Sequence, residues 1–520
     1  MADVIVDGNG LTIEDVVLIA RDPRVLARLS DSARESIARS RRGVEAFLAA
    51  GERVYGITTG FGALKDHFIS PDHSRELQRN MIMSHSVGVG EPFPEEVVRG
   101  MLLVRANALA KGYSGIRLSV VQALLDLLNR GVYPVIPAKG SVGSSGDLAP
   151  LSHLTLTLIG LGEAVYEGKR MASAQALSLA GLEPVVLEAK EGLALINGTT
   201  AMTALAALAV HDAENLAATA DVAGAMSLEA MQGVPAALDP RLHAARPYPG
   251  QIAVAANLRA LIEGSDLVCC ERASGEPPAR VHDAYCLRCM PQVHGAVRDA
   301  IAYARQVVTT ELNSATDNPL LFTEGGEGQV TPISGGNFHG EPIALAMDFL
   351  GIAVAELGSI SERRIARLVD AHANEGSLPP FLTPSSGLHS GFMLAQYVAA
   401  ALVSENKVLA HPASVDSIPT SAGMEDHVSM GTIAARQARE ILGNVMDVLS
   451  IVLMAGAQGI DLRLLQTRAR PGKGTALAHQ TVRKGVPFLE ADAVMYPYLA
   501  TVRELIAAGE FADLLRSLLQ

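Results

Sequence analysis

The 520-residue sequence is poor in cysteine, in aromatic residues and in positive charge, and the first and last of these shortages each exclude a class of protein. Four cysteines in this length suit a reducing cytoplasm rather than a disulfide-stabilised fold, and tryptophan is absent. Only 42 Lys and Arg stand against 55 Asp and Glu, which gives a net charge of −13. We therefore expect no general attraction to nucleic acid or to an anionic membrane.

Long apolar runs are missing as well. Stretches such as Ile451–Ala455 are short, and no segment reaches the roughly 18–20 uninterrupted apolar residues of a membrane-spanning helix. The opening residues, MADVIVDGNGL, bring an acid early and no basic region, which argues against a signal peptide. Because 49% of the residues are hydrophobic and 19% are charged, we expect a folded cytoplasmic protein with a large core and no membrane segment.

Helical periodicity dominates what is present. Val120–Leu128 repeats leucine at helical spacing, and Ala201–Val210 is rich in alanine and leucine. Residues 341–370 predict one long helix, or two with a break near Gly358. Ile433–Ala457 predicts another helix that is apolar around most of its circumference, which is typical of a buried helix.

Strand signals are few, with short strands expected at Asp3–Val6 and Val132–Ile136. Mixed, glycine-rich sequence gives way to helices near residue 200. We therefore expect a mainly α protein in two parts. A smaller mixed N-terminal lobe would cover residues 1–200, and a long central helical bundle with C-terminal helices would cover residues 201–520.

Two loops interrupt the helical pattern. Val54–Gly62, VYGITTGFG, places three glycines and two threonines around two aromatic residues. Gly264–Asp283 has no clean period. Loops of this length inside a compact domain are usually functional or mobile.

A third unusual stretch, GSVGSSGDLAP, spans Gly140–Pro150, and its first, fourth and seventh residues are glycines. This spacing indicates a backbone that turns tightly or is approached closely. One interpretation is a turn before a helix, capped by Asp147 or Ser145. The phosphate-binding patterns and the G-x-S-x-G pattern of hydrolases do not match, although a serine amidase with Ser144 or Ser145 as nucleophile stays an alternative.

Another interpretation uses the backbone itself. In a strained Ser-Ser-Gly turn, the Gly146 nitrogen can attack the Ser144 carbonyl carbon, because glycine has no Cβ to block the approach. Loss of two waters, one of which takes the Ser145 hydroxyl, leaves a five-membered ring with an exocyclic methylene. That group is a strong electrophile made from the chain alone.

GSVGSSGDLAPLSHL closely resembles the segment that forms this 4-methylidene-imidazol-5-one (MIO) group in the aromatic amino-acid ammonia-lyase family. Further blocks resemble the family in its order, between about residues 50 and 440, and the branch that acts on histidine is the most similar. The resemblance implies an ammonia-lyase/fumarase-like fold and a homotetramer in which several subunits build each active site. The other blocks are VYGITTGFG, LQRNMIMSHSVGVG, GLALINGTT, DAYCLRCMPQVHGA, ELNSATDNPL, SGGNFHGEP, LPPFL and EDHVSMGTIAARQARE.

The resemblance implies that Ser144, Ser145 and Gly146 become MIO, with no external cofactor. A carbon–nitrogen lyase of this kind captures the amine of a small amino-acid substrate, and a base takes the β-proton, leaving a trans-alkenoic acid. For histidine the product is trans-urocanate. The implied site residues are Tyr55 as the base, Arg288 as the carboxylate clamp, Asn197 for the carboxylate or adduct, Tyr285 near the amine, and Phe338 with Asp147 to form and hold the ring.

Substrate choice rests on two places. Ser84-His85 fits lyases that act on histidine and some tyrosine-acting relatives, and the Glu425 carboxylate can accept a hydrogen bond from an imidazole N–H. Two positions depart from the family. Met424 replaces the usual Gln, which leaves strict histidine specificity open, and Ser144 replaces the usual alanine but contributes only its carbonyl to the ring.

Alternatives stay open. Tyrosine or phenylalanine ammonia-lyase and 2,3-aminomutase use the same electrophile, and a non-catalytic helical assembly protein would keep the fold without the ring. His85, His339 and His427 lie in separate blocks without a metal-binding pattern, so we expect no metal. Cys286 and Cys289 form a lone CxxC and are expected to be structural thiols.

Overall fold

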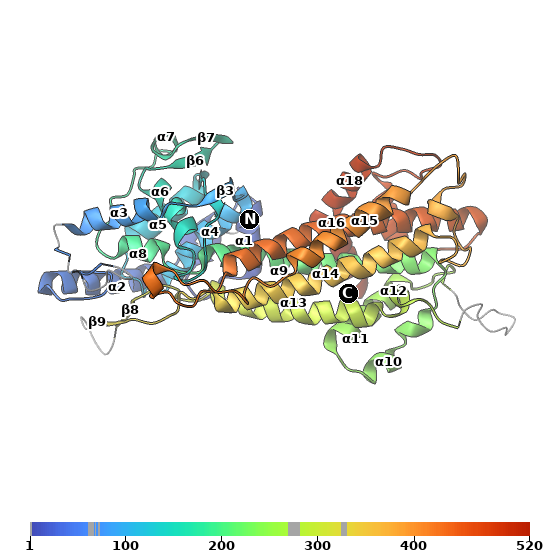
Figure 1. Ribbon diagram of the computed structural model, residues 1–520, viewed down its shortest axis with the longest axis horizontal. Coiled ribbons are helices and arrows are strands. Elements are labelled where there is room, and N and C mark those ends of the chain that lie inside the picture. Colours follow the sequence, from blue (N-terminus) through green and yellow to red (C-terminus); the bar gives the residue numbers. More distant parts are fainter. Residues whose placement is uncertain (1–2, 61–66, 68, 71–72, 269–280, 324–329) are drawn as a thin grey trace. The chain divides into compact units, whose positions relative to one another are not determined.

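The computed structural model describes residues 3–60, 67, 69–70, 73–268, 281–323 and 330–520 (Figure 1). It is mainly α-helical, which confirms the fold class expected from the sequence. The described chain forms two compact units. Unit 1 comprises Met1–His211, Arg305–Asp348 and Pro412–Arg436, and unit 2 comprises Asp212–Ala304, Phe349–His411 and Gln437–Gln520.

Unit 1 contains all the strands of the described residues, in four small sheets. β1 and β2 pair in parallel, whereas the β3–β5, β4–β6–β7 and β8–β9 sheets are antiparallel. Both strands expected from the sequence are confirmed, as β1 and β4. The strands are β1 (Val4–Val6), β2 (Ala27–Leu29), β3 (Val89–Pro92), β4 (Val132–Pro134), β5 (Pro137–Lys139), β6 (Glu163–Tyr166), β7 (Lys169–Ala172), β8 (Leu320–Thr323) and β9 (Val330–Ile333).

α1, α2 and α5 pack against α4 (Glu95–Ala110), in which every residue from Val97 to Ala110 is buried, and α3, α6 and α8 pack against one another. Local signals set the helix ends: Thr12 and Asp15 form a capping box before α1, and Gly51 ends α2 with a φ of 67°. The helix predicted at Val120–Leu128 is confirmed as α5. The helices are α1 (Ile13–Arg21), α2 (Asp31–Ala50), α3 (Ser74–His85), α4 (Glu95–Ala110), α5 (Leu118–Asn129), α6 (Leu148–Leu158), α7 (Ser173–Leu179) and α8 (Glu191–Ile196).

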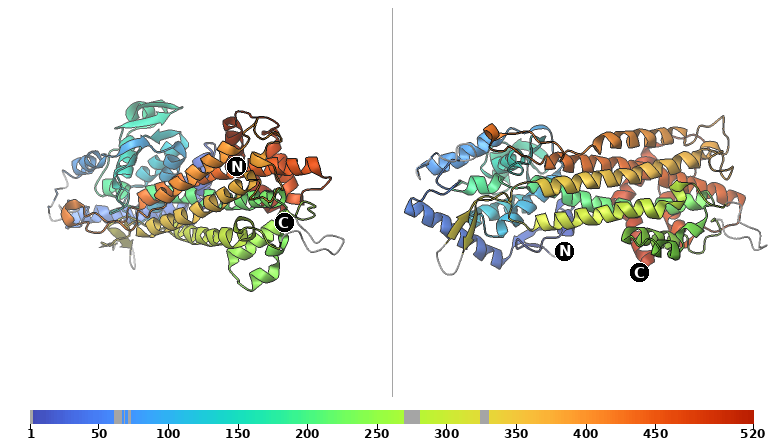
Figure 2. Two further views of the ribbon diagram at one scale, coloured as in Figure 1. Left: turned by 45° about the vertical axis from the view of Figure 1, so that its right-hand side comes forward. Right: turned by 60° about the horizontal axis from the view of Figure 1, so that its bottom comes forward.

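Four longer helices begin in one unit and end in the other, and unit 2 is built from their remaining parts and from shorter helices (Figure 2). The long helices are α9 (Thr200–Ala230), α13 (Met290–Leu312), α14 (Glu341–Val369) and α16 (Gly431–Gln466). The shorter ones are α10 (Pro240–Ala244), α11 (Pro249–Leu261), α12 (Tyr285–Arg288), α15 (Met393–Leu409), α17 (Lys473–Arg483), α18 (Tyr496–Ala507) and α19 (Glu510–Leu519).

α14 runs through Gly358 without a break, which decides between the two alternatives for residues 341–370. The glycine serves packing instead. A Cβ on Gly358 would lie 3.2 Å from Val445 Cγ2, and one on Gly351 would lie 3.2 Å from Ile441 Cδ1. Small residues on α14 therefore let its unit 2 part approach α16 closely.

Among the described residues, α14 and α16 are long and apolar enough to cross a membrane by length and composition alone. This differs from the expectation of no such segment, because glycines and isolated charges interrupt the apolar runs without much lowering their mean hydropathy. Within the fold, 61% of the apolar window of α14 and 83% of that of α16 are buried, and core helices of soluble proteins pass the same test.

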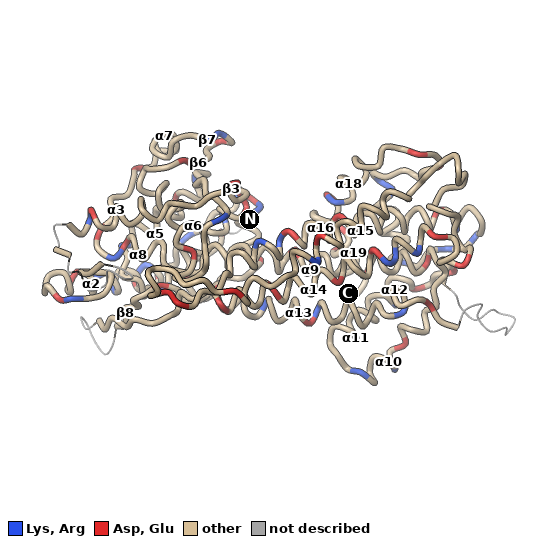
Figure 3. Tube along the Cα trace, viewed as in Figure 1, with Lys and Arg blue, Asp and Glu red and all other residues tan. Residues whose placement is uncertain are grey.

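Lys and Arg are interspersed with Asp and Glu along the trace of the described residues (Figure 3). Both loops singled out in the sequence are described in part. Residues 61–62 of VYGITTGFG lie outside the described residues, as do residues 269–280 of Gly264–Asp283, which include Cys269 and Cys270.

Candidate active site

The glycine–serine stretch forms the connection between β5 and α6 in unit 1. Gly140, Gly143 and Gly146 have φ angles of 135°, 73° and 70°, a region that favours glycine, so the predicted tight turning is confirmed. A Cβ on Gly146 would lie 2.1 Å from the carbonyl carbon and oxygen of Gly198. The backbone of the INGTT block thus presses directly against the Ser-Ser-Gly tripeptide.

Hydrogen bonds fix the tripeptide in this contact. The Gly198 N–H donates to the Ser145 carbonyl oxygen at 3.2 Å, and the Asn197 Nδ2 donates to the same oxygen at 3.3 Å. In return the Asp147 N–H donates to the Gly198 carbonyl oxygen at 2.8 Å. Two donors therefore converge on one carbonyl oxygen of the tripeptide.

Asp147 is fully buried at the start of α6, but its side chain does not cap that helix, which corrects one interpretation of the turn. Its Oδ1 accepts hydrogen bonds from Ser141 Oγ, at 3.0 Å, and from Thr432 Oγ1, and its Oδ2 accepts from the Met202 N–H at 2.9 Å. Burial raises the pKa of this carboxyl, and the hydrogen bonds partly offset that rise. Asp147 ties the turn to the first residues of α9 and α16.

Glu425 contacts both serines directly. Its Oε2 accepts from Ser144 Oγ at 2.8 Å and from Thr420 Oγ1 at 2.7 Å, and its Oε1 accepts from Ser145 Oγ at 3.1 Å. A short antiparallel bridge between Thr420 and Glu425 holds this segment, with the Thr420 N–H donating to the Glu425 carbonyl oxygen at 2.9 Å. The carboxylate therefore stands at the tripeptide, 280 residues away in sequence from Ser145.

A cavity of about 680 Å³ in unit 1 brings five of the expected site residues together: Tyr55, His85, Ser145, Asn197 and Glu425. This volume lies within the roughly 300–1,000 Å³ of small-molecule sites. A neighbouring cavity of about 310 Å³ reaches Ser144 and Gly146 and shares His85 and Glu425. The apolar part of the larger wall comes from Ile69, Leu77, Met81, Leu148, Leu193 and Ile196.

Tyr55 stands in a turn that its own neighbours hold. Thr58 Oγ1 accepts from the Val54 N–H at 2.9 Å and donates to the Glu52 carbonyl oxygen at 2.6 Å. Ile57 anchors the turn in a core cluster with Val54. The threonines of VYGITTGFG thus shape the loop, and its tyrosine lines the cavity.

His85 ends α3 at the wall of both cavities, where its Nδ1 lies 3.0 Å from Ser84 Oγ. Burial lowers the pKa of this imidazole, with a smaller opposing effect from the charge of Glu425. The neutral ring therefore predominates near pH 7, and it can donate from one nitrogen and accept at the other.

Besides the buried Asp147, three of the expected residues line neither of these two cavities. Phe338 follows β9 in unit 1, half-buried, and lines neither of them. Tyr285 and Arg288 stand on α12 in unit 2, where the Arg288 guanidinium packs over the Tyr285 ring at 4.8 Å from its centroid. Tyr285 is 71% exposed.

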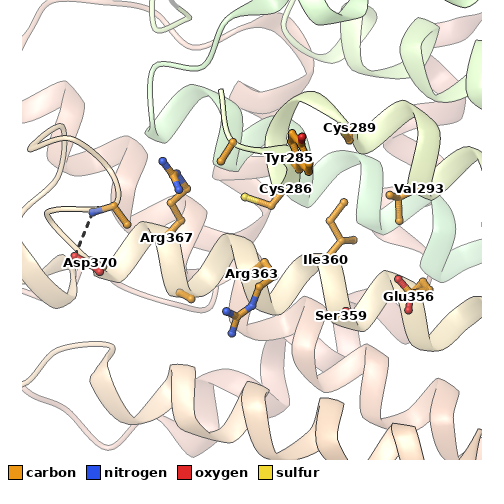
Figure 4. A pocket seen from close by; sticks show the side chains of 13 residues that line it. Tyr285, Cys286, Cys289, Val293, Glu356, Ser359, Ile360, Arg363, Arg367 and Asp370 are labelled. Carbon is orange, nitrogen blue, oxygen red and sulfur yellow. Dashed lines mark hydrogen bonds between the residues drawn. The ribbon is translucent and has the colours of Figure 1, made fainter. Parts of the chain in front are cut away.

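Tyr285 lines a cavity of about 600 Å³ within unit 2 (Figure 4). Cys286 and Cys289 line the same cavity. α14 contributes most of the other side chains, among them Arg363 and Arg367, and α13 contributes Val293. Both cysteines are free thiols, and burial raises the pKa of Cys286.

A network of buried hydrogen bonds supports α12. Arg364 donates to the Cys286 carbonyl oxygen at 3.3 Å and to His294 Nε2 at 3.3 Å, so the other ring nitrogen, Nδ1, donates to Asp221 at 2.8 Å. Burial raises the pKa of Asp221, but the charge of Arg298 and hydrogen bonds from His294 and Asn257 outweigh it and bring that pKa below its ordinary value. The position of the Tyr285 backbone thus depends on residues deep in unit 2.

This network predicts a pH-dependent stability. Burial lowers the pKa of His294, so below about pH 6.5 this residue is protonated in the unfolded chain but stays neutral in the folded chain. Folding stability should therefore fall as the pH drops through 6.5, by up to about 1.4 kcal/mol per pH unit from this residue. In His294→Gln, the fall in the free energy of unfolding should be shallower by that amount when urea denaturation is measured from pH 8 to pH 5.5. Equal slopes in parent and variant would contradict this assignment.

Two further residues contribute to the site and were not predicted from the sequence. Arg105 is fully buried in α4, and its Nη2 donates to the Asn197 carbonyl oxygen at 2.8 Å, directly behind the tripeptide contact. Its signal was available, because a lone arginine inside the apolar run MLLVRANALA indicates a buried partner. Thr420, which donates to Glu425, carried no such signal.

The chain is similar to known aromatic amino acid lyases over most of its length. The family model for aromatic amino acid lyases matches residues 11–484. A histidine ammonia-lyase from Chloroflexus aurantiacus is 54% identical over 98% of this chain and 97% of its own length. The crystal structure of histidine ammonia-lyase from Trypanosoma cruzi has a TM-score of 0.91 at 43% identity, covering 99% of this chain and 96% of that one. Tyrosine aminomutase from Streptomyces globisporus has a TM-score of 0.90 at 40% identity, covering 99% of both chains.

The cavity at the serine tripeptide has the size of a small-molecule site, and the match to lyases over most of the chain shows that the protein is an enzyme. The match over most of the length identifies which kind: the chain belongs to the aromatic amino acid lyase family.

Proposed function

We propose that this enzyme eliminates ammonia from L-histidine to give trans-urocanate, in the cytoplasm and without an external cofactor. The observation that carries the proposal is the Glu425 carboxylate, which stands at the serine tripeptide in a cavity lined by both polar and apolar side chains. A carboxylate there can accept the imidazole N–H of histidine, whereas a phenyl ring offers no donor.

The residues present fit an MIO group at Ser144–Gly146. Gly146 lacks the Cβ that would collide with Gly198, and the turn is already tight. When formed, the group supplies an electrophile that ordinary side chains lack. Asn197 Nδ2 and the Gly198 N–H donate to the Ser145 carbonyl oxygen, so negative charge that develops on that oxygen is stabilised.

Other residues bind substrate and move its proton. Tyr55 lines the same cavity, and we assign it to take the β-proton. Asn197 Oδ1 is buried with no hydrogen-bond partner among the described residues, which leaves an acceptor for a substrate N–H. His85 lines the same cavity and adds a second polar contact, and the apolar side chains exclude water.

We propose that Arg288 clamps the substrate carboxylate with its guanidinium and that Tyr285 stands near the amine. Both belong to unit 2, and in a homotetramer they would come from another subunit. Phe338 would likewise reach the ring from a neighbour. Exposed apolar side chains in unit 2 support such burial between subunits, including Phe349, Leu394 and Tyr397, which are 49%, 56% and 58% exposed.

Two details bear on the alternatives. Met424, which replaces the usual Gln, is 49% exposed and lines neither cavity, so the departure leaves the polar wall intact. In a serine amidase a base, usually histidine or lysine, would activate Ser144 or Ser145, whereas both hydroxyls here donate to Glu425.

The intact mass of the purified protein and a substrate panel test the proposal. We expect a mass two waters below that of the sequence, localised to the peptide that holds residues 144–146, and urocanate absorbance with histidine. Tyrosine and phenylalanine should give no more than a few per cent of that rate. A modified protein that acts on tyrosine instead would favour an aminomutase or another lyase, and an unmodified mass would overturn the mechanism.

A further inference from the structure

Ser144 has a hydroxyl at the position where the family usually has the methyl of an alanine. The side chain is 5% exposed, and its Oγ donates to Glu425 Oε2 at 2.8 Å. Thr420 Oγ1 donates to the same oxygen at 2.7 Å. Glu425 Oε1 has a different partner, the Ser145 hydroxyl at 3.1 Å.

The two serines differ in what ring formation does to them. The proposed cyclisation joins the Gly146 nitrogen to the Ser144 carbonyl carbon and expels that carbonyl oxygen as one water. Ser145 loses its Oγ and its Cα hydrogen as the second water. The Ser144 hydroxyl takes no part and stays. Glu425 Oε1 therefore loses its donor, while Oε2 keeps both of its donors.

We propose that Ser144 is a specificity-determining positioning residue, whose hydroxyl, with that of Thr420, fixes Glu425 Oε2 so that Oε1 faces the cavity as an acceptor for the imidazole N–H. The inference rests on the proposed function for the identity of the substrate. Two donors on one oxygen restrict the carboxylate to one orientation. An alanine at this position would leave Thr420 as the single donor and let the carboxylate rotate.

The kinetic test uses Ser144→Ala in the full-length protein. We expect the same loss of two waters and a similar kcat, but a KM for histidine about tenfold higher, since hydrogen bonds to charged groups are worth about that factor or more. Thr420→Val should raise KM similarly. In the double variant, the fold-increase in KM should be smaller than the product of the two single increases, because both hydroxyls act on one oxygen.

A binding test needs no turnover. Ser145→Ala cannot lose its hydroxyl as water and lacks the same donor on Oε1, so it reports on the positioned carboxylate alone. Calorimetry with 3-(imidazol-4-yl)propionate should show about tenfold weaker binding to Ser144→Ala/Ser145→Ala than to Ser145→Ala, by the same hydrogen-bond energy. Binding of 3-phenylpropionate should be equal in the two, because it offers no N–H.

The outcomes separate the two proposals. Equal KM values and equal affinities for the imidazole probe would overturn the role of Ser144 whatever the reaction is. A Ser144→Ala protein that retains both waters would overturn it as well, since the hydroxyl would then serve cyclisation. If the parent makes no urocanate, the proposed function fails, while the probe comparison still decides whether Ser144 positions Glu425.

Discussion

Gly146→Ala should yield a folded protein that keeps the full mass of its sequence and produces no measurable urocanate. A Cβ at this position would lie 2.1 Å from the Gly198 carbonyl carbon and oxygen, which are backbone atoms and cannot swing away. The φ of 70° adds strain for a residue with a side chain. Relief of the clash must separate Gly146 from Gly198, which withdraws a donor from the Ser145 carbonyl oxygen and adds bulk to the attacking nitrogen.

Gly168→Ala provides a matched control. Gly168 has a φ of 71°, and a Cβ there would meet no atom within 4 Å. This variant should lower the free energy of unfolding by about 1 kcal/mol, from backbone strain alone, and it should retain the two-water mass loss and the activity. Intact mass and urocanate formation of the two variants give the comparison. Cyclised, active Gly146→Ala would show that the close contact is not needed.

Lys190→Met should destabilise unit 1 by about 3–5 kcal/mol, as expected when one partner of a buried ion pair is removed. Lys190 is fully buried, Asp317 is 3% exposed, and Lys190 Nζ lies 2.6 Å from Asp317 Oδ2. Burial lowers the pKa of Lys190 and the Asp317 charge opposes that fall. Without the ammonium, the Asp317 carboxylate is left in the interior without its ion-pair partner, and the electrostatic interaction with the buried Arg105 compensates its charge only in part.

The urea midpoint of the full-length protein measures this effect, and two variants bracket it. Lys190→Met/Asp317→Asn removes both charges and should recover most of the loss. Arg516→Met breaks an exposed pair with Asp513, whose side chains are 68% and 67% exposed, and should shift the midpoint little. Because Lys190 immediately precedes α8, which ends at Asn197, the single variant should also weaken substrate binding. An unshifted midpoint would disprove the energetic role of the pair.

The sequence by itself determined the features that depend on near neighbours. Leucine and alanine periodicity predicted α5, α14 and α16, because helix hydrogen bonds and amphipathic faces repeat within a few residues. The three glycines of the serine stretch predicted a tight turn, and all three have positive φ angles, which glycine adopts without strain. The resemblance of short sequence blocks to the family was enough to name Tyr55, His85, Asn197 and Glu425 as candidate site residues.

Tertiary structure alone decided what these residues touch. Glu425 meets Ser144 across 281 positions of chain, and Arg105 reaches the Asn197 carbonyl oxygen across 92. Asp147 has the sequence of a helix cap, yet its carboxyl turns to Thr432 and the Met202 N–H instead. Such contacts depend on how whole helices pack, and no local propensity encodes them. For the same reason the sequence placed Tyr285 and Arg288 beside the other site residues by analogy, whereas the fold of one chain assigns them to unit 2.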